Sequence, residues 1–319
     1  MYKKFSLWCD FIERDFIENE FARLIDSGIV NAATSNPAIF KESILNSPAY
    51  KEQLSKLKGR DKKEIYETLA ITDIRNAAKK LLKNYEKGDD GFISIEVDPR
   101  LCDDEVLTID EGVRLFKSIN MPNVMIKIPA TKAGYGAMRE LLSRGININA
   151  TLIFSPTQTT KCLEVIKDGM DSCKQESLPH AVISIFVSRF DRAADEKLDD
   201  KFRLGILNAT KCYHLIENAA VKNTRALFAS TGTKSDKLPK DYYIKELMYK
   251  NSINTAPLEA IKSFIKNNKK IKEPLCMEEV EKELSMIQKK INLDKLYEKL
   301  LNDGLEQFKK AFDEILKSI

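Results

Sequence analysis

Short apolar runs of strand length alternate with helical patterns about eight times along this chain, and this order constrains its fold more than any other feature. The predicted strands cover residues 7–11, 31–36, 92–97, 124–130, 148–154, 181–187, 226–230 and 252–255. Repeated strand–helix units are typical of a parallel sheet, and eight of them in roughly 250 residues predict an α/β fold, a single closed (β/α)8 TIM barrel. A doubly wound open sheet is the alternative, but no glycine-rich phosphate loop follows any strand, which argues against its dinucleotide-binding form.

The 319 residues show no break in composition, so we expect one domain over residues 1–319. Residues 277–319 are expected to form a helical C-terminal extension packed on that domain. Apolar residues recur in its last part at helical spacing, namely Leu296, Leu300, Phe308, Phe312 and Ile315. This apolar face predicts packing on the barrel or on a partner subunit, which would make a homodimer.

Composition excludes several classes of protein. Net charge is only +4 with both signs interspersed, and no basic block suggests nucleic-acid binding. No run reaches transmembrane length, and acidic residues come too early for a signal peptide, so we expect no membrane association. The six cysteines lack CxxC spacing and there are two histidines, which predicts a cytoplasmic protein without a metal site or another cofactor.

The strand at 124–130, VMIKIPA, carries one lysine in an apolar run. Strands of a parallel sheet are covered on both faces, and burial of an ammonium ion without a partner is costly. A neutral amine at the end of a strand is what Schiff-base chemistry with a carbonyl compound requires. Taken alone, Lys127 has a second interpretation, in which it lies at an exposed strand end and extends its ammonium group into water.

Side chains alternate between the two faces of a strand, and here six strands have one apolar face and one face with a polar group. In 148–154, for instance, Ile148, Ala150 and Leu152 are expected on the helix-facing side, opposite Asn149 and Thr151. The opposite faces of the six strands contain Asp10, Thr34 with Asn36, Ser94 with Glu96, Lys127, Asn149 with Thr151, and Ser184 with Phe186. In a barrel these groups point inward, and those at the carboxyl ends of the strands converge on one pocket.

This set combines one amine, two carboxylates and several hydrogen-bonding groups. It favours covalent carbonyl catalysis in which a carboxylate moves protons. No Ser-His-Asp arrangement competes with it. A single buried serine or asparagine is usually structural, but that explanation does not fit six strands with the same arrangement.

At these residues the sequence resembles transaldolase over nearly its whole length. The resemblance depends on TSNP at 34–37, SIEVD at 94–98, IKIPAT at 126–131, NATLIFS at 149–155 and ISIFVSR at 183–189. It implies transfer of a dihydroxyacetone unit from sedoheptulose 7-phosphate or fructose 6-phosphate to glyceraldehyde 3-phosphate or erythrose 4-phosphate. Phosphorylated sugars are therefore the expected partners.

The resemblance also implies a role for each matching residue. Lys127 would form the Schiff base, Asp10 would be the acid/base during carbon–carbon cleavage, and Glu96 with Thr151 would hold the water that shuttles protons. Donor-sugar contacts would come from Thr34, Asn36, Asn149, Ser184 and Phe186. Arg189 is the expected phosphate ligand, with Ser230 and Lys234 completing that site. The alternatives are an exposed Lys234 and an Arg189 paired with a carboxylate such as that of Asp191.

Three alternative functions agree less well with the sequence. The fructose 6-phosphate aldolases of the same family release free dihydroxyacetone, but they carry glutamine and tyrosine where this chain has Glu96 and Phe186, and they are much shorter. An inactive sugar-phosphate-binding barrel is disfavoured, because each matching catalytic position retains the right chemical type. A nicotinamide oxidoreductase has no fingerprint in its favour.

Overall fold

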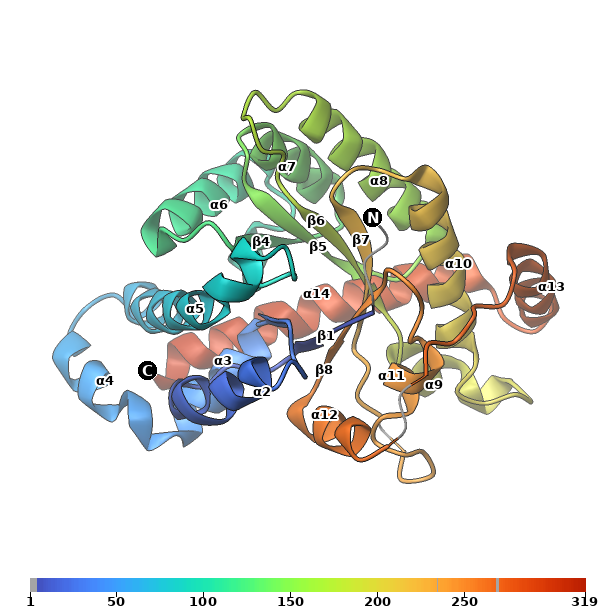
Figure 1. Cartoon of the computed structure of the whole chain (residues 1–319), viewed down its shortest axis with the longest axis horizontal. Helices are drawn as coiled ribbons and strands as arrows, with labels where there is room; N and C mark the ends of the chain where they lie inside the picture. The colour runs from blue at the N-terminus through green and yellow to red at the C-terminus, as the bar shows by residue number, and fades with distance from the viewer. Residues whose placement is uncertain (1–4, 234, 268–269) are drawn as a thin grey trace.

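Eight parallel strands form a closed barrel in the order of the sequence, so the predicted (β/α)8 fold is confirmed. A computed structural model describes residues 5–233, 235–267 and 270–319. The strands are β1 (Ser6–Cys9), β2 (Ala32–Thr34), β3 (Ile93–Glu96), β4 (Val124–Pro129), β5 (Asn147–Ile153), β6 (Ala181–Phe186), β7 (Thr224–Ala229) and β8 (Ile253–Ala256). Figure 1 shows them at the centre of the molecule with helices around them.

The helices follow the strands in alternation. They are α1 (Arg14–Phe16), the π-helix η1 (Ile17–Phe21), α2 (Ala22–Asp26), α3 (Pro37–Asn46), α4 (Lys51–Leu57), α5 (Lys62–Glu86), α6 (Glu105–Ile119), α7 (Lys132–Ser143), α8 (Pro156–Asp171), α9 (Arg189–Ala194), α10 (Leu204–Ala219), α11 (Tyr242–Glu246), α12 (Leu258–Ile265), α13 (Met277–Gln288) and α14 (Leu293–Ser318), with 3-10 turns at Pro48–Tyr50, Pro99–Leu101 and Asp195–Lys197. Polar caps place several helix starts directly after strand ends: Asn36 caps α3, Thr131 caps α7 and Ser155 caps α8. Short strand-to-helix connections therefore keep residues next to the strand ends in fixed positions.

The two faces of the strands enter two different apolar clusters, as the alternation predicts. Ile126 and Ile128 pack outward in the layer between strands and helices. Met125 packs inward with Trp8 and other residues that fill the barrel. The inward direction of Lys127 follows from the same alternation, two residues after Met125.

The prediction for Leu152 was wrong. Leu152 belongs to the inner cluster instead of the helix-facing one. The pairing of β5 with β6 shifts between Ala150 and Ile153, so that two residues of β5 lie opposite one residue of β6, and Leu152 has a φ of 58°. Such a β-bulge reverses the alternation beyond it, and a bulge cannot be read from a regular apolar pattern.

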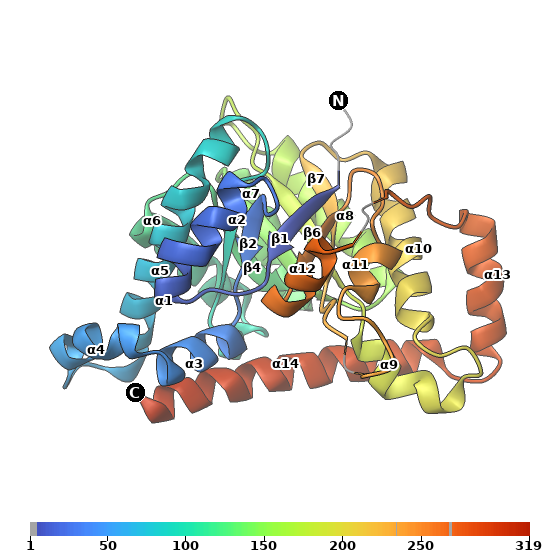
Figure 2. The same cartoon turned by 60° about the horizontal axis from the view of Figure 1, so that its bottom comes forward.

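The C-terminal helix α14 lies across one end of the barrel, as Figure 2 shows. Its residue Gly304 lies against β5, where a Cβ atom would approach Leu152 Cδ2 to 3.0 Å. At the far end of the helix, Glu314 pairs with Lys41 of α3 at 2.5 Å. Helix α14 therefore contacts strand β5 and helix α3 of the chain's own barrel. No helix in the described ranges is long and apolar enough to cross a membrane.

Candidate active site

A pocket of about 150 Å³ opens at the carboxyl ends of the strands, beneath α14. Its lining contains the predicted residues Asp10, Thr34, Asn36, Lys127, Thr151, Ser184, Phe186, Arg189 and Ser230, together with Ala38, Ala229, Thr255 and Phe308. The predicted Glu96 and Asn149 are buried next to it and contact its lining residues. Residues from all eight strands or strand ends and from α14 thus meet at the end of the barrel where such folds concentrate chemistry.

Lys127 is inside this pocket and only 5% exposed, so the interpretation as a lysine that reaches bulk water is wrong. Its Nζ lies 3.3 Å from a carboxylate oxygen of Glu96, and it donates a hydrogen bond to the carbonyl oxygen of Ser35 at 3.1 Å. The ring centroid of Phe308 lies 5.5 Å from Nζ on the side of α14. The amine therefore has a polar side toward the barrel and an apolar cover toward the helix.

Glu96 is a carboxyl group whose surroundings favour its neutral form. Burial raises the pKa of Glu96 to about 7, although the neighbouring Lys127 acts in the opposite direction. Apart from the ion pair with Lys127, the carboxylate oxygens of Glu96 have no hydrogen-bond partner among the described residues, and the hydroxyl of Thr151 has none either. A carboxyl group with such a pKa can exchange protons near neutral pH.

Asn149 is held between two serine hydroxyls. Ser184 donates to Asn149 Oδ1 at 2.6 Å, and Asn149 Nδ2 donates to Ser94 Oγ at 3.0 Å. All three residues are at most 2% exposed. Because the serines come from β3 and β6, on opposite sides of β4 and β5, the amide is fixed in one orientation beside Lys127, its register partner.

Asp10 follows β1 and accepts a hydrogen bond from the hydroxyl of Thr34 at 2.6 Å. Asn36 accepts from the backbone N–H of Ile39 at the start of α3, at 3.1 Å. This bond uses Asn36 Oδ1, so the Nδ2 group is the one that can donate to a ligand.

Arg189 is the first residue of α9 and lines the pocket. Its guanidinium carbon lies 5.3 Å from the centroid of the Phe186 ring, and burial lowers the pKa of Arg189 below its ordinary value. Its Nη1 is buried and donates to no described residue. The carboxylate of Asp191, the predicted alternative partner, accepts instead from the hydroxyl of Tyr243. Arg189 is therefore a lining residue of the pocket whose Nη1 has no hydrogen-bond partner among the described residues.

Ser230 stands beside Arg189 in the pocket lining. It has a φ of 54°, and its hydroxyl lies 3.2 Å from that of Ser188. A serine in the left-handed region is uncommon and marks a backbone held by its surroundings. The other predicted residue of the phosphate site, Lys234, lies outside the described residues.

Four lining residues were not predicted as site residues, namely Ala38, Ala229, Thr255 and Phe308. Thr255 is in β8, where the strand alternation would have identified an inward hydroxyl had it been applied to 252–255. Phe308 was recognised only as part of an apolar helix face. No local pattern shows that this face closes the pocket.

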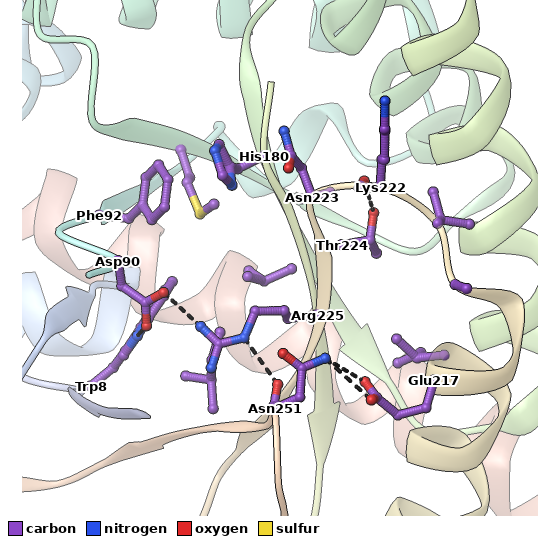
Figure 3. Close-up of a pocket in the computed structure, with 17 residues that line it drawn as sticks. Trp8, Asp90, Phe92, His180, Glu217, Lys222, Asn223, Thr224, Arg225 and Asn251 are labelled. Atoms are coloured by element: carbon purple, nitrogen blue, oxygen red, sulfur yellow. Dashed lines mark hydrogen bonds and ion pairs between the residues drawn. The ribbon is translucent and has the colours of Figure 1, made fainter. Parts of the chain in front are cut away.

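A second cavity, of about 450 Å³, lies at the opposite end of the barrel and is shown in Figure 3. Three of its charged groups take part in hydrogen bonds: Arg225 donates to Asp90 at 2.6 Å and to the carbonyl oxygen of Asn251 at 2.9 Å, and Asn251 donates to Glu217 at 2.9 Å. Among the described residues that line it, no lysine pairs with a carboxylate. Within the described ranges, no group of three metal-ligating side chains occurs at either end. The small pocket is therefore the candidate active site.

Comparison with known proteins identifies relatives over the full chain. The family model described as Transaldolase/Fructose-6-phosphate aldolase matches residues 7–319. A Campylobacter jejuni protein named Transaldolase, from strain 81-176, is 53% identical, with 99% of this chain and 100% of the relative covered. A Helicobacter pylori protein of the same name, from strain Shi470, is 48% identical, with 99% of both chains covered.

Proposed function

Because the chain belongs to the transaldolase/fructose-6-phosphate aldolase family, we propose that it is a transaldolase acting through a Schiff base on Lys127. The observation that carries the proposal is the buried amine of Lys127 beside Glu96, 3.3 Å away, in a pocket of polar side chains. The donor is sedoheptulose 7-phosphate or fructose 6-phosphate, and the acceptor is glyceraldehyde 3-phosphate or erythrose 4-phosphate. The reaction belongs to the non-oxidative pentose phosphate pathway.

In the first step, the neutral amine of Lys127 attacks the ketone carbon of the donor. Formation of the carbinolamine and loss of its hydroxyl as water both need proton transfers. Glu96, whose pKa of about 7 suits it to accept and return protons, performs them with a water held by Thr151. The buried oxygens of Glu96 and Thr151, which lack hydrogen bonds to described residues, support this role.

In the second step, Asp10 accepts the proton of the sugar hydroxyl next to the bond that breaks. The carbon–carbon bonding electrons move to the iminium nitrogen, which leaves a three-carbon enamine on Lys127 and releases an aldose phosphate. The acceptor aldehyde then reacts with the enamine by the reverse path. The hydrogen bond from Thr34 supports this role, because it fixes the Asp10 carboxylate at the pocket wall.

Asn36, Asn149 and Ser184 bind hydroxyl groups of the three-carbon fragment, with Thr34 and Phe186 shaping its surroundings. The phosphate binds Arg189 with Ser230, and Lys234 is proposed as a further ligand. A planar guanidinium can donate two parallel hydrogen bonds to phosphate oxygens. The place of Arg189 in the pocket lining, with an Nη1 that donates to no described residue, supports this assignment.

Borohydride reduction tests the central step. With fructose 6-phosphate present, we expect covalent labelling of Lys127, detected by peptide mass spectrometry, and none in Lys127→Met. Labelling that persists at another residue of the variant would contradict the Schiff-base assignment. Lys132→Met, at the first position of α7, is a control that should be labelled normally.

The second candidate is the fructose 6-phosphate aldolase reaction, since the family includes both activities. Glu96 and Phe186 favour transfer over release. A coupled assay with and without erythrose 4-phosphate separates them. Turnover that continues without an acceptor aldehyde would favour the aldolase.

Other features of the protein are also proposals. Residues 1–319 form one domain, with 277–319 as a helical extension, supported by the contacts of α14 with β5, α3 and α9. A cytoplasmic location is supported by the six free cysteines, which need a reducing compartment to stay unpaired. A homodimer, and the absence of nucleic-acid and membrane partners, stay predictions; sedimentation of the purified protein would test the first.

A further inference from the structure

The hydroxyl groups of two threonines next to Asp10 form a chain of hydrogen bonds that ends at its carboxylate. Thr34 ends β2 and Thr255 lies in β8, and these are the two strands that flank β1 in the closed barrel. Their Oγ1 atoms are 2.6 Å apart, and Thr34 Oγ1 is 2.6 Å from Asp10 Oδ1. Both threonines are at most 3% exposed. The hydroxyls therefore meet across the end of β1, directly beside the carboxylate that follows it.

The direction of these bonds follows from the number of protons available. An ionised carboxylate only accepts, so Thr34 uses its single hydroxyl proton on Asp10. The proton between the two hydroxyls then comes from Thr255. The chain runs from Thr255 to Thr34 to Asp10, and each bond in such a chain strengthens the next.

Thr255 is itself held in place at the backbone. Thr231 donates its hydroxyl to the carbonyl oxygen of Thr255 at 2.8 Å. The backbone N–H of Asp10 donates to the carbonyl oxygen of Ala256, also at 2.8 Å. Strand β8 therefore fixes both the donor end of the chain and the backbone of the carboxylate at its other end.

We propose that Thr255 is a positioning residue for carbon–carbon cleavage, which acts through Thr34 to hold Asp10 Oδ1 and so to aim the carboxylate at the sugar hydroxyl. This inference rests on the proposed function. Loss of the Thr255 hydroxyl leaves Thr34 able to rotate its hydroxyl away from Asp10. The cleavage step then slows, whereas formation of the Schiff base on Lys127, at a different part of the pocket, continues.

Thr255→Val and Thr255→Ser test the proposal, because valine has the shape of threonine without its hydroxyl and serine restores the hydroxyl. We expect kcat of the valine protein to fall about tenfold, the scale of one lost hydrogen bond between neutral groups, with KM within about threefold of the original. Borohydride labelling of Lys127 should stay complete in this variant. The serine protein should recover most of kcat.

Thr210→Val is the matched control. Thr210 is 2% exposed, and its hydroxyl donates to Ile206 within α10, away from the pocket. This variant should lose stability as any buried threonine would, yet keep kcat. Were Thr255→Val to fail to fold, Thr255→Cys would replace it, because a thiol fills the space but is a weak donor, and its kcat should be lowered likewise.

The results distinguish the positioning role of Thr255 from the proposed Schiff-base function of Lys127. A Thr255→Val or Thr255→Cys protein with unchanged kcat overturns the positioning role and leaves the proposed function standing. Raised KM with unchanged kcat would mean that Thr255 binds the sugar directly, which also overturns it. Failure of Lys127 labelling in the unaltered protein would overturn the proposed function itself, before any variant is compared.

Discussion

The Nζ atom of Lys127 lies 3.3 Å from a carboxylate oxygen of Glu96 because the two residues are register partners on the neighbouring strands β4 and β3. Both side chains point into the barrel and both are buried. A buried polar group is costly without a partner, and the carboxyl group of Glu96 is a partner for the Lys127 amine that can also exchange protons. One strand pairing therefore provides both the proposed nucleophile and the group proposed to move its protons.

The pH dependence of the reaction should depend on Glu96. Its pKa is raised to about 7, so the carboxyl is protonated below this pH and becomes a base above it. We expect kcat/KM to rise tenfold per pH unit below about 7 and to level off above it. Glu96→Gln should lower kcat by about 10²–10⁴ and remove this acid limb.

Glu217→Gln is the control for this experiment. Burial raises the pKa of Glu217 as well, but Glu217 lies at the opposite end of the barrel beside Asn251. Its variant should keep the acid limb. If the rise of kcat/KM below pH 7 persisted in Glu96→Gln, a different titrating group would be responsible for it.

Removal of Arg189 should weaken phosphate binding more than folding. A lost charge-assisted pair costs about 1.5–3 kcal/mol, so Arg189→Ala should raise KM for phosphorylated donors about tenfold or more. Steady-state kinetics with fructose 6-phosphate measures this, and urea unfolding should change little. Arg192→Ala, an exposed arginine of the same helix, should leave KM unchanged. Equal KM values in the two variants would place the phosphate elsewhere.

Phe308 should exclude water from the reacting amine. Its ring covers Lys127 Nζ at 5.5 Å, so Phe308→Ala opens the pocket on the side of α14. Water can then protonate the enamine carbon and hydrolyse the Schiff base. We expect free dihydroxyacetone to appear faster without an acceptor and transfer to slow, measured by an enzymatic assay for dihydroxyacetone.

Phe312→Ala separates this effect from lost stability. Phe312 lies on the same helix but packs against Tyr66 at 5.2 Å and Arg100, away from the pocket. Both substitutions create a cavity that costs about 3–5 kcal/mol. Only Phe308→Ala should change the ratio of release to transfer, at a temperature at which both proteins are folded. A similar change in both would indicate a general loosening of α14.

The opposite end of the barrel should determine stability without affecting catalysis. Asp90 accepts from buried Arg225 at 2.6 Å and from Trp8 Nε1 at 2.9 Å. Asp90→Asn fits the same backbone, whose φ is 56°, but leaves the Arg225 charge without its carboxylate. We expect a loss of about 3 kcal/mol in urea unfolding, with the specific activity of the folded protein unchanged.

Asp89→Asn is the companion to this variant. The neighbouring Asp89 is exposed and accepts from Asn31 at 3.0 Å, so its substitution should change stability little. A lowered specific activity in folded Asp90→Asn would mean that the two ends of the barrel are coupled.

The number and order of strands, and the face on which each inward group lies, could be predicted from sequence. Apolar periodicity is local: Ile126 and Ile128 face the helices because side chains of a strand alternate, whatever its neighbours are. The same rule directs Lys127 inward and brings most of the candidate site together. It fails at Leu152, where the extra residue of a bulge reverses the alternation.

Only the tertiary structure determined which of these groups touch. The pairing of Lys127 with Glu96 depends on the register between strands, the contact of Thr255 with Thr34 depends on closure of the barrel, and the cover of Phe308 depends on the path of α14. Register, closure and helix path result from packing between residues distant in sequence. A periodic pattern shows which face of an element is apolar, but the partner of that face is decided by the shape of the whole barrel.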